Sequence, residues 1–297
     1  MSVLKMVNLQ RITEAGSFRR IAVILMAIVA AVIMSGTSAL DASAAAAKMT
    51  APKLVAEKTY GSGDTHPYKK QTSTLKVNWK SVSGAKKYDV YIMGGQYKTW
   101  KKYKTVTTTS CTVTGLKRTT EYKFKVRAVS GNTYSAFSSV QTLKTARMDY
   151  DQAGWEAMCR IVYHEVGQIN NSMWDKPIVY VADCVANRYV AAKYTNNKTW
   201  APYYKKYTSV QQVIYNSGGF MSSAALTRDG ATYSKVPSKV KLAVWGAVYG
   251  KTTYKNIKND YNVYYWCNRS YKTTSSKIAY SFKIPWGYFN IWRSYWG

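Results

Sequence analysis

Two glutamates in the second half of the chain are the best candidates for acid–base chemistry. Glu156 and Glu165 are the only glutamates after residue 145. They are nine residues apart in a stretch with helical periodicity, and at about 100° per residue they point to opposite sides of a helix. Glu156 belongs to the predicted first turn, where a carboxylate interacts favourably with the helix dipole. The two glutamates are therefore not expected to form a paired-carboxylate site together.

Glu165 follows an apolar stripe and stands between His164 and Gly167. The stripe repeats at i, i+3, i+4, i+7 and i+8, as one face of a helix does: Trp155, Met158, Cys159, Val162 and Tyr163. Either Asp149 or Asp151 is suited to cap this helix, and Gly167 to end it. A carboxyl at such a helix end can enter a groove beside the core. An ordinary exposed helix-end residue is the alternative, and periodicity does not distinguish the two.

Metal and thiol chemistry have weaker support. The chain has two histidines, His66 and His164, and four cysteines without a closely spaced pair: Cys111, Cys159, Cys184 and Cys267. We therefore expect no structural zinc site and no cofactor. Cys159 is about 140° from His164 around the predicted helix, which is poor geometry for a thiolate–imidazole pair. A Cys159–Cys184 disulfide and free buried thiols are equal alternatives.

Further helices must position this glutamate. Periodicity, Pro and Gly signals and a Thr208/Gln211 capping box predict helices over 177–194, over 208–217 and from Ser238 to Gly250. A small β element is expected near 261–267, followed by an extended aromatic segment. Residues 150–297 are therefore predicted to form a mainly α domain.

The preceding part of the chain has a different period. Short alternating segments separated by turns indicate a β-sandwich over residues 50–145: Leu75–Trp79, Tyr88–Ile92, Cys111–Val113 and Tyr122–Val126. Trp79 on an early strand, and Leu116 six residues before Tyr122, resemble a fibronectin type III domain. This resemblance implies that Tyr122 ties a loop to its strand and that Trp79 and Leu116 fill the core.

Residues 1–44 have the pattern of a signal peptide. Four basic residues precede an unbroken apolar run, Ile21–Met34, and small residues end at Ala42–Ala44. Cleavage there is expected; an uncleaved anchor extended through Ser35–Leu40 is the alternative. The protein is therefore predicted to be secreted, extracellular or associated with the cell wall, with no stable membrane insertion once the leader is cleaved.

The charge indicates the kind of partner. Lys plus Arg is 43 against 14 Asp plus Glu, a net charge of +29. Scattered lysines suit loose attraction to an anionic matrix better than base readout, so anionic cell-wall polymers are favoured over nucleic acid.

Four patches of the second domain carry a second resemblance: Cys159–Gln168, Val181–Arg188, Val210–Tyr215 leading to Gly219–Phe220, and Tyr264–Asn268. They resemble the cell-wall hydrolase family of spore-cortex-lytic enzymes over residues 153 to about 290. The resemblance implies a lysozyme-like domain that cleaves peptidoglycan glycan strands, usually by lytic transglycosylation, with Glu165 as the catalytic residue.

The substrate-binding candidates are aromatic or polar residues in or beside these patches: Tyr163, Gln168, Phe220, Tyr264, Tyr265 and Asn268. Aromatic rings suit the C–H faces of sugars, and Tyr265 is the first choice for the wall beside the acid, with Trp266 a further candidate. Conventional hydrolysis would need a second carboxylate, for which Asp183 and Asp229 are the candidates.

The sequence departs from the family in two places. Gln168 replaces the usual second glutamate, and Gly287-Tyr288-Phe289 replaces a Gly-x-His segment. Gln168 can form hydrogen bonds but cannot supply charge. The alternative function is therefore a non-catalytic protein that binds cell wall or carbohydrate.

Overall fold

The computed structural model of the protein describes residues 48–56, 70–168, 171–195, 197–216 and 219–294. The chain divides into two units, Met1–Thr50 and Ala51–Gly297, and every element below belongs to the second. The predicted signal peptide, residues 1–44, lies outside the described residues. Within those residues, no helix has both the length and the apolar character that a membrane span requires.

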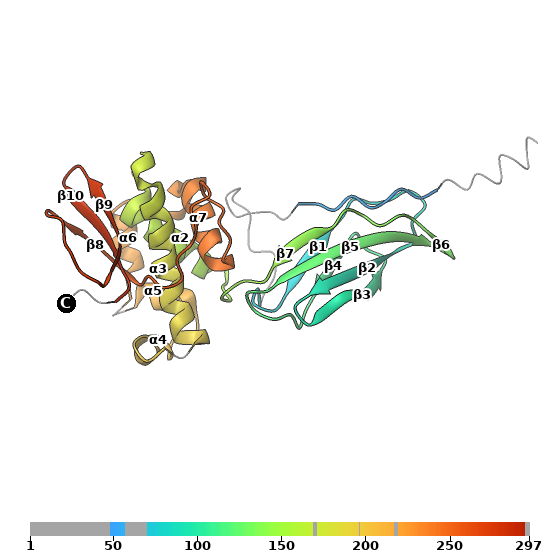
Figure 1. Ribbon diagram of the computed structural model, residues 1–297, viewed down its shortest axis with the longest axis horizontal. Coiled ribbons are helices and arrows are strands. Elements are labelled where there is room, and N and C mark those ends of the chain that lie inside the picture. The colour runs from blue at the N-terminus through green and yellow to red at the C-terminus, as the bar shows by residue number, and fades with distance from the viewer. Residues whose placement is uncertain (1–47, 57–69, 169–170, 196, 217–218, 295–297) are drawn as a thin grey trace, which may run out of the picture. The chain divides into compact units, whose positions relative to one another are not determined.

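The first part of the second unit is a β-sandwich, shown in cyan to green in Figure 1. Its strands are β1 (Leu75–Asn78), β2 (Lys87–Gly94), β3 (Tyr97–Val106), β4 (Ser110–Val113), β5 (Glu121–Ser130), β6 (Thr133–Tyr134) and β7 (Gln141–Lys144). β1 pairs with β4, and the second sheet has the order β3-β2-β5-β6, with β7 also paired to β5. Alternate β5 residues, Tyr122, Phe124 and Val126, are fully buried. The predicted period-two pattern is confirmed.

Tyr122 has the structural role that the sequence predicts. Its hydroxyl accepts a hydrogen bond from the backbone N–H of Lys117 at 2.9 Å and donates one to Gln96 Oε1 at 2.6 Å. Trp79 and Leu116 are buried in the sandwich core. The hydroxyl thus ties two loops to strand β5.

A mixed helical region with some strands follows. Its helical elements are α2 (Gln152–Val162), the π-helical turn η2 (Tyr163–Gly167), η3 (Ser172–Trp174), α3 (Asp175–Tyr194), α4 (Ala201–Tyr204), α5 (Val210–Tyr215), α6 (Ser223–Arg228), η4 (Tyr233–Lys235) and α7 (Ser238–Tyr249). Its strands are β8 (Tyr265–Arg269), β9 (Ile278–Ile284) and β10 (Gly287–Trp292). The buried helix α3 contacts α2, α7, β8 and β10, and the sheet flanks the helices in Figure 1.

Helix ends mostly follow the predicted signals. Asp151, not Asp149, caps α2, and Gly250 ends α7 in the left-handed conformation with φ 62°. The predicted Thr208/Gln211 capping box is wrong by one residue. Ser209 accepts from the N–H of Gln212, and the Gln212 side chain accepts from Thr208. Thr208 and Ser209 are adjacent and each has a hydroxyl that can cap a helix. The sequence pattern does not show which of the two accepts the hydrogen bond from the first helical turn.

The predicted small β element is larger than expected. β8 pairs with the central strand β10, which also pairs with β9, so the final aromatic segment forms a three-stranded antiparallel sheet. One face of this sheet supplies buried residues to the helical core, including Phe289 and Ile291. The sheet places β8 beside the end of α2.

Candidate functional site

A widened helical turn carries the two titratable residues of the site. The last turn after α2 is the π-helix η2, which contains His164 and Glu165. Such turns are rare, and many occur at functional sites. A Cβ atom at Gly167 would lie 2.6 Å from Val240 Cγ2, so only glycine allows this turn to pack against α7. Gly167 thereby fixes the position of Glu165 in the fold.

The Glu165 carboxyl is held on both oxygens. Oε2 accepts a hydrogen bond of 2.8 Å from the indole Nε1 of Trp266 in β8. Oε1 lies 3.3 Å from Nδ1 of His164. The side chain is 25% exposed. The acid is therefore largely shielded from bulk solvent while one quarter of its surface stays accessible.

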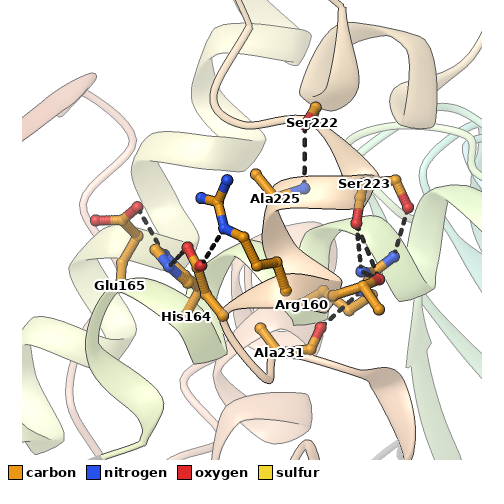
Figure 2. A network of polar contacts seen from close by, with 10 residues as sticks. Arg160, His164, Glu165, Ser222, Ser223, Ala225 and Ala231 are labelled. Carbon is orange, nitrogen blue, oxygen red and sulfur yellow. Dashed lines mark hydrogen bonds and ion pairs between the residues drawn. The ribbon is translucent and has the colours of Figure 1, made fainter.

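His164 extends this contact to a second carboxylate. Its Nε2 lies 3.3 Å from Asp229 Oδ2, and Asp229 Oδ1 accepts from Arg228 Nε at 2.9 Å. The hydrogen bond and the charge of Arg228 lower the pKa of Asp229. Figure 2 shows the imidazole of His164 beside the carboxyl group of Glu165. These side chains therefore form a continuous series of contacts, which runs from Glu165 to His164, then to Asp229 and finally to Arg228.

Arg160, one helical turn before His164, fixes the segment that carries Asp229. Its guanidinium donates to oxygens on α5, on α6 and in the loop after α6: Tyr215 Oη, Ser223 Oγ, Ser223 O, Thr227 Oγ1 and Ala231 O. Figure 2 shows its contacts with Ser223 and Ala231. Several donors in one rigid fork hold these elements more firmly than single bonds would. Arg160 thereby brings Asp229 to His164.

Aromatic rings adjoin the acid on the side of β8. The Trp266 ring stacks on Phe220, with centroids 5.4 Å apart and an interplanar angle of 9°. Arg188 of α3 lies over Phe220 at 4.3 Å and over Tyr265 at 4.7 Å. Its Nε donates to the backbone oxygen of Tyr264 at 2.7 Å. This arginine therefore fixes both the strand start and the rings beside the acid.

A cavity of about 510 Å³ lies beside the start of β8. It is lined by Asn197, Thr199, Trp200, Asn262, Tyr264, Tyr265, Lys277, Arg293 and Ser294. Trp200 and Tyr265 form one wall, with ring centroids 5.2 Å apart. Glu165 is outside this lining, so the cavity is separate from the position of the acid.

The structure separates the predicted substrate-binding residues. Phe220 lies beside the acid through Trp266, whereas Tyr264 and Tyr265 line the neighbouring cavity. Tyr163 packs half-buried against the core, and Gln168 and Asn268 are exposed. Trp266 contacts Glu165 directly, although the sequence favoured Tyr265 for that position. Successive strand residues point to opposite faces, which is why one residue of register decides the choice.

Asp183 and Asp229 have different positions. Asp183 is fully buried and accepts hydrogen bonds from Asn259 Nδ2 at 2.8 Å and from the N–H of Asp260 at 2.7 Å. Burial raises its pKa to about 7. One turn later on α3, the Asn187 amide donates to the oxygens of Asp260 and Val263. Asp183 and Asn187 together hold the loop before β8, so Asp183 has a structural role. Of the two candidate carboxylates, Asp229 is therefore the one that lies near Glu165.

All four cysteines are free thiols, so the Cys159–Cys184 disulfide alternative is not formed. Both of these thiols are fully buried, and burial raises their pKa values. Across the described ranges, no group of three or more His, Cys, Asp or Glu side chains is arranged to hold a metal ion.

Comparison with known proteins identifies the first domain. The fibronectin type III family model matches residues 65–143, so the chain contains a fibronectin type III domain. The solved structure titled FN3tt is 26% identical and covers 32% of this chain and 95% of its own, with a TM-score of 0.25. An Fn3-like protein from Clostridium thermocellum is 23% identical and covers 33% and 90%, with a TM-score of 0.24. No curated protein matches the chain.

Proposed function

We propose that the protein is an exported enzyme that cleaves the glycan strands of peptidoglycan, using Glu165 as a single general acid and base. The observation that carries this proposal is the geometry of the carboxyl. It is three-quarters shielded, receives an indole hydrogen bond on Oε2 and contacts His164 on Oε1. A catalytic carboxyl must be held in place in this way and still be reached by substrate.

The reaction needs only one carboxyl. Protonated Glu165 donates its proton to the glycosidic oxygen as the bond from that oxygen to the anomeric carbon breaks. The resulting carboxylate then removes a proton from a hydroxyl of the same sugar, whose oxygen attacks the anomeric carbon. The products are a new chain end and an internal anhydro ring, no water is consumed, and the acid is regenerated. This lytic transglycosylase route fits a site built on one glutamate.

Hydrolysis with a second carboxylate is less well supported by the contacts. Asp183 is fully buried and engaged with the loop before β8. Asp229 is separated from Glu165 by the imidazole of His164, which contacts both. Neither is free to activate water at the anomeric carbon, which retaining and inverting enzymes require of their second carboxylate. The anhydro-forming reaction is therefore the proposal.

Export and wall attachment complete the proposal. The predicted leader would take the protein out of the cytoplasm. Without residues 1–44, the protein keeps 39 basic and 12 acidic residues, and this net charge of +27 would hold it in a matrix of anionic wall polymer. The peptidoglycan substrate and these polymers are the proposed partners.

A second candidate function is binding without catalysis, and the fibronectin type III domain favours it. On one sheet of the sandwich, Lys125 Nζ lies 4.4 Å from the ring centroid of Trp100 and 4.2 Å from that of Phe137. Arg127 lies 4.0 Å over the ring of Tyr134. Cationic groups beside exposed or partly exposed rings suit an anionic polysaccharide, so this domain can retain the protein on the wall whether or not Glu165 is catalytic.

Clearing of a suspension of purified cell wall tests the enzymatic proposal. The wild-type protein should reduce the turbidity, and Glu165→Gln, which keeps the side-chain shape, should bind the wall without clearing it. Mass spectrometry of the soluble products should find anhydro ends. Binding without clearing by the wild type, over a range of pH and salt, would support the non-catalytic alternative. Reducing ends in place of anhydro ends would show hydrolysis.

A further inference from the structure

The cavity beside the start of β8 has a lining that fits a charged ligand. Its volume of about 510 Å³ falls within the range of small-molecule sites, about 300–1,000 Å³. Two cationic side chains, Lys277 and Arg293, belong to its lining, and the lining includes no acidic residue. The cavity therefore presents positive charge to a ligand, whereas the site of Glu165 presents carboxyl groups.

Arg293 is held in place from outside the cavity. Its Nη2 lies 3.3 Å from Asp260 Oδ2, and its Nη1 donates to the backbone oxygen of Asn262 at 3.1 Å. The Asp260 carboxylate is shared, because it also accepts from the N–H of Asn262 at 2.9 Å and from Tyr280 Oη at 3.0 Å. The Arg293 side chain is still 41% exposed. The guanidinium is thus preorganised while much of its surface stays accessible to an anion.

Lys277 supplies a second charge beside this arginine. The N–H of Arg293 donates to the backbone oxygen of Lys277 at 2.8 Å, so the two residues are neighbours at the edge of the sheet. In the part of the chain that the structure describes, the Lys277 ammonium has no hydrogen-bond or ion-pair partner. An ammonium carries three N–H donors and no acceptor. A ligand with a negative group would therefore complete this side of the cavity.

The rest of the lining suits a sugar. Asn197 Oδ1 accepts from the backbone N–H groups of Thr199 at 2.9 Å and Trp200 at 3.3 Å, which leaves its amide N–H for a ligand oxygen. The rings of Tyr264 and Tyr265 are partly exposed and suit the C–H face of a pyranose. A polyol phosphate would match the charge but has no ring to place against this wall. The lining therefore favours a pyranose that carries an acidic group and an acetamido group.

We propose that this cavity binds an acidic sugar of the N-acetylmuramic acid type, with its carboxylate at Lys277 and Arg293 and its ring against Tyr264 and Tyr265. The choice of a wall sugar rests on the proposed function. In peptidoglycan a stem peptide caps this carboxyl group as an amide, so the free acid is present where an amide-hydrolysing enzyme has removed the stem. The cavity therefore retains strands that such a reaction has supplied.

Binding of single sugars to the whole protein tests the cavity independently of cleavage, because a monosaccharide has no glycosidic bond to a second sugar. In an NMR titration, N-acetylmuramic acid should bind about 5- to 10-fold more tightly than its uncharged methyl ester or N-acetylglucosamine, as expected for two partly exposed charge contacts. Lys277→Glu should abolish this preference. Lys283→Glu is the matched control, because Lys283 is an exposed lysine of β9 outside the lining, and it should keep the preference.

The other results separate the remaining ligands. Equal binding of the acid and its ester by the wild type, or an unchanged preference in Lys277→Glu, overturns the inference. Glycerol phosphate that binds as tightly as the acid and depends on Lys277 would show a polyol phosphate site and overturn it. Tighter binding of muramyl dipeptide, whose lactyl carboxyl is an amide, would show a stem-peptide site and also overturn it. A wild-type protein that binds the acid but does not clear cell wall contradicts only the proposed function, and one that clears the wall without this binding contradicts only the cavity assignment.

Discussion

Replacing Trp266 by Phe tests whether the indole N–H is needed at the catalytic carboxyl. The substitution keeps an aromatic ring that can stack on Phe220, where the native centroids are 5.4 Å apart, and it removes the 2.8 Å hydrogen bond to Glu165 Oε2. A hydrogen bond to a charged group contributes about 1.5–3 kcal/mol. If that free energy is expressed in the transition state, kcat should fall about 10- to 150-fold.

Turbidity clearing and kinetics on soluble glycan strands measure this effect. KM should change little, because the lost bond holds the acid rather than the sugar. Trp286→Phe is the matched control. Trp286 is exposed and its ring stacks on Trp174, so this substitution should leave clearing unchanged. Thermal unfolding checks that both variants are folded. A folded Trp266→Phe with wild-type kcat would refute the assigned role of the indole.

Three other substitutions test the scaffold. Gly167→Ala should cost about 1–3 kcal/mol of unfolding free energy and reduce clearing, because its Cβ would lie 2.6 Å from Val240 Cγ2; Gly167→Ala with Val240→Ala should recover clearing, and no recovery contradicts the clash. Tyr122→Phe should cost about 1–3 kcal/mol in chemical denaturation, because the N–H of Lys117 loses its acceptor, without changing kcat; a fall in kcat contradicts a purely structural role. The pKa of Asp183 is raised to about 7, so its stabilising contribution is complete below about pH 4 and is lost as the pH rises through 7. The pH slope of the unfolding free energy should therefore differ between wild type and Asp183→Asn by up to about 1.4 kcal/mol per pH unit in that window, and identical slopes would contradict a raised pKa.

Local patterns predicted most of the elements. The period-two segments became the sandwich strands, and the apolar stripe starting at Trp155 became α2. These features depend on side-chain alternation and capping within a few residues, so the chain itself carries the information. The structural role of Tyr122 was implied by the fibronectin type III resemblance, and its hydrogen-bond donor, Lys117, is only five residues away.

The sequence by itself determined the fibronectin type III sandwich, the helices that follow and the isolation of Glu165 as a glutamate without a nearby partner on its helix. Only the tertiary structure decided what surrounds that carboxyl. Trp266 is 101 residues away in sequence, and Asp229 is 65 residues from His164. Such contacts depend on how α6 and β8 pack around α2 and α3, and on which face of β8 turns inward. No local period encodes that choice, because burial against distant elements selects it.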